Sequence, residues 1–296
     1  MQSINALTLT PDVNDWLLNS RDPRILHVFD HACNLINERR EVLSIVTPQI
    51  GNGPFNLVVE DEILFSEHLY IESAIAISDN QLTLADLTID TNNAIPWPPR
   101  PNWEVLHAKR GNILTQIASL PITNNQPLLP NSLVSTLSSA LANADLPVSL
   151  TVAKQLAGLG QGLTPAGDDF IVGALYASWI IHPTNIVRVL AEEIAGAAAP
   201  LTTSLSAAWL RAAGKGEAGI LWHEFFDALA SVGRTLAPHV ICLANQAGVA
   251  KRTYSVAVQE TVDKILAVGE TSGADALAGF IGLLAAWREE TGISNE

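Results

Sequence analysis

The first hundred residues alternate short apolar runs with polar turns, which is the pattern of a β-sheet. Glycine, proline, asparagine and aspartate separate the runs from one another. The Asp79-Asn80 pair between two of the runs is typical of a two-residue hairpin turn. We predict a short helix at 11–18 and strands at 42–46, 55–59, 74–78, 81–84 and 87–90.

A proline-rich segment, Pro96–Pro101, ends this region, and apolar residues then recur at helical spacing. A polar segment with several prolines at 120–130 is predicted to be a linker. Alanine is abundant beyond it, which favours closely packed helices. We predict helices at 105–119, 133–144, 151–157, 170–181, 185–198, 203–213, 218–230, 238–247, 254–267 and 275–290.

These patterns predict an α+β protein in which a β-rich, antiparallel N-terminal part precedes a mainly α-helical C-terminal domain. We place the β-rich domain at residues 1–128 and the helical domain at residues 129–296. The chain has 296 residues, of which 48% are hydrophobic, so it is long and apolar enough for one large or two ordinary domains.

The stretch Gly158–Asp169 reads GLGQGLTPAGDD and runs directly into an apolar segment at 170–176. Its glycines allow positive φ and leave backbone N–H groups open to an oxyanion. Pro165 stiffens the approach to the helix that follows. A polar, flexible loop that leads into a buried helix is where we expect binding or chemistry.

A second stretch near the C-terminus, Gly269–Gly279, repeats this pattern as GETSGADALAG. The pairs that align without a gap are Ala166 with Ser272, Gly167 with Gly273, Asp169 with Asp275, and Gly173 with Gly279. One residue less in the second loop also aligns Gly162 with Gly269 and Thr164 with Thr271. We infer two similar loop–helix motifs related by a pseudo-twofold axis, whose helix N-termini face one cleft.

The candidate site residues are the aspartates, hydroxyl residues and glycines of these two motifs. The candidate catalytic residues are Asp168, Asp169 and Asp275, and the candidate substrate- or anion-binding residues are Gly160, Gly162, Thr164, Gly167, Thr271, Ser272 and Gly273. The aspartates suit Mg²⁺ ligation, hydrogen bonding to an amide, or general base chemistry. Their structural alternative is helix capping. Gly173 and Gly279 instead fit tight packing between helices.

Composition narrows the choice of partners. The formal net charge of −14 argues against nucleic acid and anionic membranes, which need a basic face. The apolar runs at 170–181 and 276–287 are shorter than the roughly 20 residues that span a bilayer. Two isolated cysteines, Cys33 and Cys242, and no signal peptide favour the cytoplasm. The histidines have no metal-ligand spacing with a third ligand, so they predict no metal site.

The motif Gly160–Phe170 resembles the signature of the AllH-like family, formerly a domain of unknown function, which includes the oxamate carbamoyltransferase subunit AllH. The family motif usually reads G-x-G-L-T-P-S-G-D-D, so Ala166 stands where serine is common. The family's second motif resembles G-H-S-S-G-x-D-x-L-x-G, and the repeat described above matches it with Glu270 in place of histidine. Segments 51–59 and 202–206 are also similar, so the resemblance covers most of the chain.

The resemblance implies a role in ureide catabolism, as in purine and allantoin degradation. Such a chain would act with an FdrA-type partner subunit to convert oxalurate and phosphate into oxamate and carbamoyl phosphate. Phosphate and a small anionic amide substrate would bind at the two glycine-rich helix N-termini. Two other functions stay open at this point. One is a non-catalytic module that binds a small ligand or docks a catalytic partner, and the other is a Mg²⁺-dependent hydrolase. A homo-oligomer is compatible with either.

Overall fold

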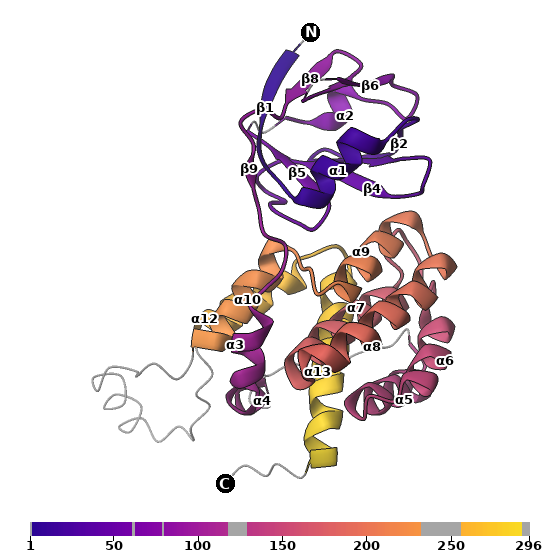
Figure 1. Cartoon of the computed structure of the whole chain (residues 1–296), viewed down its shortest axis with the longest axis vertical. Helices are drawn as coiled ribbons and strands as arrows, with labels where there is room; N and C mark the ends of the chain where they lie inside the picture. The colour runs from indigo at the N-terminus through magenta and orange to yellow at the C-terminus, as the bar shows by residue number, and fades with distance from the viewer. Residues whose placement is uncertain (1, 61–62, 79, 118–128, 232–255, 292–296) are drawn as a thin grey trace, which may run out of the picture. The chain divides into compact units, whose positions relative to one another are not determined.

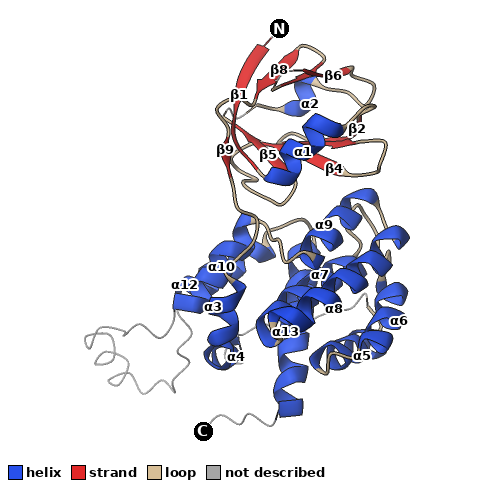
Figure 2. Cartoon of the chain, in the orientation of Figure 1, coloured by secondary structure: helices blue, strands red, loops and turns tan. Residues whose placement is uncertain are grey.

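The structure is a computed structural model that describes residues 2–60, 63–78, 80–117, 129–231 and 256–291 (Figure 1). The chain divides into two compact units. One comprises Met1–Arg100 with Glu217–Ile220, and the other comprises Pro101–Gly216 with Leu221–Glu296. Figure 2 shows strands in the first unit and helices throughout the second. The predicted α+β fold class, with a β-rich N-terminal part and a helical C-terminal part, is confirmed.

The first unit is built on one sheet, with nine strands among the described residues. The strands are β1 (Gln2–Leu9), β2 (Arg24–Val28), β3 (Ala32–Ile36), β4 (Val42–Val46), β5 (Asn56–Val59), β6 (Ile75–Ser78), β7 (Gln81–Leu84), β8 (Leu87–Asp90) and β9 (Ile95–Pro96). Their order is β2-β3-β4-β5-β1-β8-β7-β6, and β9 pairs with β1. All five predicted strands are present.

The sheet is mixed, whereas the sequence pattern predicts antiparallel pairing throughout. Parallel pairs join β1 to β8, β1 to β9 and β4 to β5. The first half of β1 pairs with β8 and its second half pairs with β5, so the N-terminal strand lies in the middle of the sheet. A sequence pattern reveals pairing mainly through hairpins, which are antiparallel, and it does not reveal pairing between distant strands.

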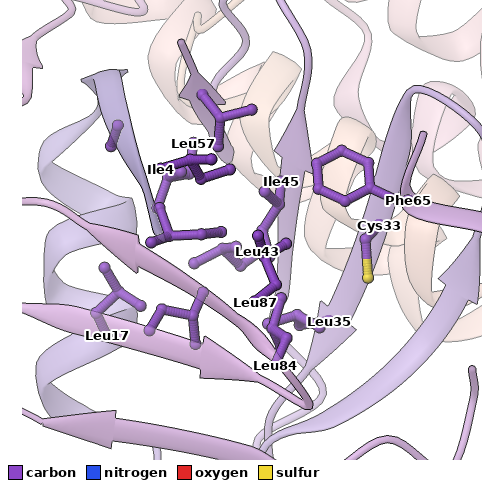
Figure 3. Close-up of a cluster of buried hydrophobic side chains, with 14 of the residues drawn as sticks. Ile4, Leu17, Cys33, Leu35, Leu43, Ile45, Leu57, Phe65, Leu84 and Leu87 are labelled. Carbon is purple, nitrogen blue, oxygen red and sulfur yellow. The ribbon is translucent and has the colours of Figure 1, made fainter. Parts of the chain in front are cut away.

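The core of this unit is formed by buried side chains of the sheet and of two short helices, α1 (Pro11–Asn19) and α2 (Phe65–His68) (Figure 3). Helix α1 buries Val13, Trp16 and Leu17, and α2 contributes Phe65. The side chain of Thr10 caps α1 by accepting a hydrogen bond from the N–H of Val13 at 3.3 Å.

A short segment from much later in the chain, Glu217–Ile220, completes the first unit. The N–H of Ala218 donates to the carbonyl of Pro99 at 2.9 Å, and the N–H of Ile220 donates to the carbonyl of Asn52 at 2.9 Å. The helical unit begins at Pro101, so its first helices precede the expected domain boundary at residue 128.

The described helices of the second unit are α3 (Trp103–Ala108), α4 (Arg110–Ile117), α5 (Asn131–Ala142), α6 (Leu146–Leu156), α7 (Ala166–Ile181), α8 (Thr184–Ala198), α9 (Ser204–Gly214), α10 (Ile220–Ser231), α12 (Val256–Leu266) and α13 (Ser272–Thr291), with the short 3-10 helix η1 (Ala199–Leu201). Helix α10 begins at Ile220, which is the last residue of the segment Glu217–Ile220 that belongs to the first unit. The predicted helix at 238–247, with Cys242, lies outside the described residues. The single helix predicted at 105–119 is divided into α3 and α4 in the described residues, and the other predicted helices are found within a few residues of their expected bounds.

Helix α7 is the centre of the helical unit, because every one of its residues is buried. It packs most extensively against α13 and also contacts α3, α5, α6, α8 and α9. Aromatic rings from other helices pack on its second half; the rings of Trp103 and Trp179, for example, lie 5.9 Å apart. None of the described helices combines the length and apolarity needed to cross a membrane.

Candidate functional site

Helices α7 and α13 approach each other through two glycines that occupy equivalent positions. A Cβ on Gly173 would lie 1.7 Å from the carbonyl oxygen of Ala276, and a Cβ on Gly279 would lie 1.9 Å from the carbonyl oxygen of Phe170. The two contacts are reciprocal, because each glycine meets the carbonyl three residues before the partner's glycine. The packing role expected for these glycines is confirmed, and the contact has the form of a pseudo-twofold.

A second pair of glycines fixes the start of each helix against the end of the helix before it. A Cβ on Gly167 would lie 2.0 Å from the carbonyl oxygen of Leu156, at the end of α6. A Cβ on Gly273 would lie 1.8 Å from the carbonyl oxygen of Ile265, near the end of α12. The helix pairs α6–α7 and α12–α13 are therefore two copies of one helix–loop–helix corner.

The loops of the two corners align differently from the expected register. The N–H groups of the two corner glycines donate to the carbonyls of Leu159, at 2.8 Å, and Val268, at 3.1 Å. Because these two bonds are equivalent, the second loop is three residues shorter than the first, whereas the sequence alignment makes it one residue shorter. Gly160, rather than Gly162, is then the counterpart of Gly269. The sequence alone favours the alignment with Gly162 because Gly160 and Gly162 are only two residues apart, and either can be matched to Gly269.

One hydrogen bond joins the two loops. The hydroxyls of Thr164 and Ser272 lie 2.7 Å apart, and either one can donate. Asp169 is close to both hydroxyls, and hydrogen bonds from Ser272 and Thr164 favour its ionised form. The N-terminal ends of α7 and α13 are therefore adjacent, as the sequence repeat predicts. This group of residues, with Asp275 and its neighbour Thr271, is called the helix joint below.

Asp168 points away from the helix joint into a network of its own. Its Oδ1 accepts a hydrogen bond from the N–H of Gly158 at 2.9 Å, and its Oδ2 accepts from the hydroxyls of Thr202 and Ser206, the latter at 2.8 Å. The side chain is completely buried, and burial raises its pKa against the effect of these three bonds. In this structure Asp168 ties the start of α7 to the start of α9.

We expect Asp168→Asn to destabilise the helical unit by about 1–3 kcal/mol. The amide nitrogen of asparagine cannot accept the hydroxyl hydrogen bonds that Oδ2 accepts from Thr202 and Ser206, so buried groups are left without partners. Urea unfolding followed by circular dichroism measures the change. Asp227→Asn, on an exposed position of α10, is the matched control and should be neutral. Equal stability of both variants would contradict the assigned role.

Asp169 and Asp275 occupy equivalent positions at the joint and both lack a full set of hydrogen-bond partners. They are 8% and 7% exposed, and Oδ2 of each is buried without a hydrogen-bond partner. Burial raises the pKa of Asp169 to about 8, and the nearby negative charges of Asp275 and Asp168 add to this against the hydroxyl bonds. Burial also raises the pKa of Asp275, opposed by a hydrogen bond from Thr271.

The remaining candidate residues fall into two groups. Gly167 and Gly273 are buried, and their N–H groups are already used within the corners, so the structure gives them a packing role. Gly160 and Gly162 lie on the exposed part of the first loop at φ values of 127° and 87°, which only glycine adopts readily. Thr271 is also exposed and lies beside Asp275.

Sequence reasoning missed the partners of Asp168. Thr202 and Ser206 lie more than thirty residues beyond it, and nothing in the tract 202–206 identifies the group that its hydroxyls bind. Thr203, between them, caps α9 and donates to the carbonyl of Leu163 at 2.5 Å. Across the part of the chain that is described, no three His, Cys, Asp or Glu residues are grouped so as to hold a metal ion.

Two family models match the chain. The model described as "Oxamate carbamoyltransferase subunit AllH" matches residues 156–284, and the model described as "AllH family N-terminal domain" matches residues 6–96. Together they cover most of the chain, and the first includes both helix–loop–helix corners from the end of α6 onward. No curated protein and no solved structure is similar enough to match.

Proposed function

The chain belongs to the AllH family, and on this premise we propose that it is a subunit of a carbamoyltransferase-type enzyme that interconverts oxalurate and oxamate in cytoplasmic ureide catabolism. The observation that carries the proposal is the pair of buried, unpartnered carboxyl oxygens on Asp169 and Asp275. Both aspartates lie inside the range that matches the oxamate carbamoyltransferase subunit model. Buried polar groups without partners are rare, and a small polar ligand at the helix joint would satisfy them.

The proposed reaction transfers a carbamoyl group from nitrogen to phosphate. A phosphate oxygen attacks the terminal carbamoyl carbon of oxalurate, and a new C–O bond forms as the C–N bond to the oxamate nitrogen breaks. The leaving nitrogen takes the proton that hydrogen phosphate gives up. The products are oxamate and carbamoyl phosphate. This chain's contribution is to bind and orient one of the small substrates at the helix joint.

The composition of the helix joint supports the need for a partner subunit. Its polar side chains are the carboxyls of Asp169 and Asp275 and the hydroxyls of Thr164, Thr271 and Ser272. None of these carries the positive charge that phosphoryl and carbamoyl phosphate oxygens call for. An FdrA-type subunit is the proposed source of such groups. The proposal uses no metal ion or other cofactor.

A second candidate function is a non-catalytic module that binds a small ligand or docks a catalytic partner. The observation that favours it is the network of Asp168, which uses the first of the adjacent aspartates for structure alone. The two functions differ in what the remaining carboxyls do. In the enzyme subunit Asp169 affects turnover, whereas in a docking module its replacement leaves turnover unchanged.

The test is carbamoyl phosphate formation from oxalurate and phosphate, measured with the chain alone and with an FdrA-type subunit added. We expect activity only in the combination, and we expect Asp169→Asn to lower the rate about tenfold or more, because it removes a carboxyl that pairs with the substrate, and a buried polar group left without its partner costs ~1–3 kcal/mol. Asp227→Asn, which is exposed, is the control. Activity of the combination that Asp169→Asn leaves intact would favour the docking module, and no activity in any combination would contradict both the reaction and the subunit assignment.

A further inference from the structure

The unpartnered hydrogen-bonding groups of the helix joint are two carboxyl oxygens. The Oδ2 atoms of Asp169 and Asp275 are buried and unpartnered, and they come from two helices whose N-terminal ends are adjacent. Both side chains are more than nine-tenths buried. Hydrogen-bonding capacity that is buried without a partner costs stability, so a ligand with matching groups would bind there favourably.

Phosphate does not match these groups. The two carboxyls repel a dianion, and the helix N-termini together offset about one unit of charge. The backbone N–H groups that usually cradle phosphate are also largely used. Those of Gly167, Asp168 and Asp169 donate to loop carbonyls at the start of α7, and those of Gly273 and Asp275 do so at the start of α13.

A primary amide matches these groups well. It offers two N–H donors and one carbonyl acceptor, whereas two carboxyls that share one proton offer acceptor oxygens and one O–H donor. Two nearby carboxyls retain a proton that a single exposed carboxyl would lose, because like charges and burial both disfavour double ionisation. The raised pKa of Asp169, at about 8, agrees with this.

The pseudo-twofold shows that Asp275 has fewer hydroxyl neighbours than Asp169. Ser272 hydrogen-bonds to Asp169, and the residue equivalent to Ser272 in the other corner is Ala166. Alanine has no hydroxyl to give to Asp275. The joint is therefore symmetric in its backbone and asymmetric in its hydrogen bonds: Asp169 receives them from Ser272 and Thr164, whereas Asp275 receives one from Thr271 alone.

We infer that Asp169 and Asp275 act as an acid–carboxylate pair that binds the primary amide or ureide group of the substrate, and that phosphate binds elsewhere in the multi-subunit enzyme. The inference deepens the proposed function and rests on it for the identity of the substrates. It assigns the amide-bearing substrate to this chain and leaves the binding of phosphate to the partner subunit.

The test is calorimetric titration of the full chain at pH 7 with three probes: oxamate, oxalate and inorganic phosphate. Oxalate is oxamate with a carboxylate in place of the amide. We expect oxamate to bind at least about tenfold more tightly than oxalate, and phosphate not to compete. Ala166→Ser, which supplies a hydroxyl to Asp275, is expected to weaken oxamate binding about fivefold to tenfold. Ala285→Ser, at an exposed position of α13, is the matched control and should bind like the wild type.

The outcomes separate this inference from the proposed function. Oxamate binding without carbamoyl phosphate formation in the complex would sustain the inference and contradict the reaction. Equal binding of oxamate and oxalate, no oxamate binding, or phosphate binding that Asp169→Asn abolishes would overturn the inference, even in an active complex. Unchanged oxamate affinity in Ala166→Ser would overturn the assignment of the unpartnered oxygen of Asp275 to the ligand.

Discussion

Replacement of Gly279 by alanine is expected to prevent stable folding of the helical unit. The added Cβ would lie 1.9 Å from the carbonyl oxygen of Phe170, well inside van der Waals contact. That carbonyl belongs to α7, which is buried along its whole length, so α7 and α13 would have to move apart. Overpacking of adjustable side chains costs about 1–3 kcal/mol, and a clash with a fixed backbone should cost at least about 3 kcal/mol.

Thermal unfolding followed by far-ultraviolet circular dichroism measures this effect. Gly173→Ala should behave in the same way, because its Cβ would lie 1.7 Å from the carbonyl oxygen of Ala276. Gly196→Ala is the matched control: it lies on an exposed position of α8, and its Cβ would meet nothing within 4 Å. The control should gain about 0.5–1 kcal/mol from improved helix propensity. Comparable melting temperatures for all three variants would show that the helices can separate without cost.

The glycine contact is the part of the site that the sequence predicts best. Gly173 and Gly279 lie in apolar segments that are too continuous to be loops, so their backbone freedom is not needed and close packing is the remaining explanation. The repeat of the motif also identifies the partner helix. Both conclusions depend on residues that are near each other in the sequence or related by a fixed offset.

The role of Asp168 is the part that the sequence does not reveal. Adjacent aspartates at the start of a helix suggest a functional pair. In an α-helix, however, consecutive side chains point about 100° apart around the helix axis. Asp168 therefore faces α9 and Asp169 faces α13. Only the packing of α9 beside α7 decides which aspartate finds a full set of hydrogen-bond donors, and that packing joins residues far apart in the chain.

The same limit applies to the β-rich unit. The hairpin of β6 and β7 and the strands β4 and β5 follow from local patterns. The central place of β1 depends on its pairing with β8, whose first residue, Leu87, lies opposite Gln2. No periodicity within either strand specifies that partner, because the hydrophobic pattern fixes the face of a strand and not its neighbour.

Asp169→Asn is expected to make the helical unit less sensitive to pH and more stable near pH 8. The pKa of Asp169 is about 8 in the folded chain, whereas an unfolded aspartate has a value near 3.9. Between these values the unfolded chain has lost a proton that the folded chain keeps. Stability therefore falls as pH rises from about 4 to about 8, by at most about 1.4 kcal/mol per pH unit for this proton, and changes no further above the folded pKa.

Urea unfolding at pH 5, 6, 7 and 8 tests this sign and separates Asp169 from its neighbours. The pKa values of Asp168 and Asp275 are raised as well, so these two groups also make the wild type lose stability as pH rises. Asparagine cannot ionise, so the curve of Asp169→Asn should be flatter and should lie above that of the wild type at pH 8. Asp168→Asn should be less stable than the wild type at pH 5, because Oδ2 of Asp168 accepts hydrogen bonds from Thr202 and Ser206 in the folded chain. Parallel curves for the wild type and Asp169→Asn would mean that Asp169 is ionised in the folded chain, and the acid–carboxylate pair would then lack its proton.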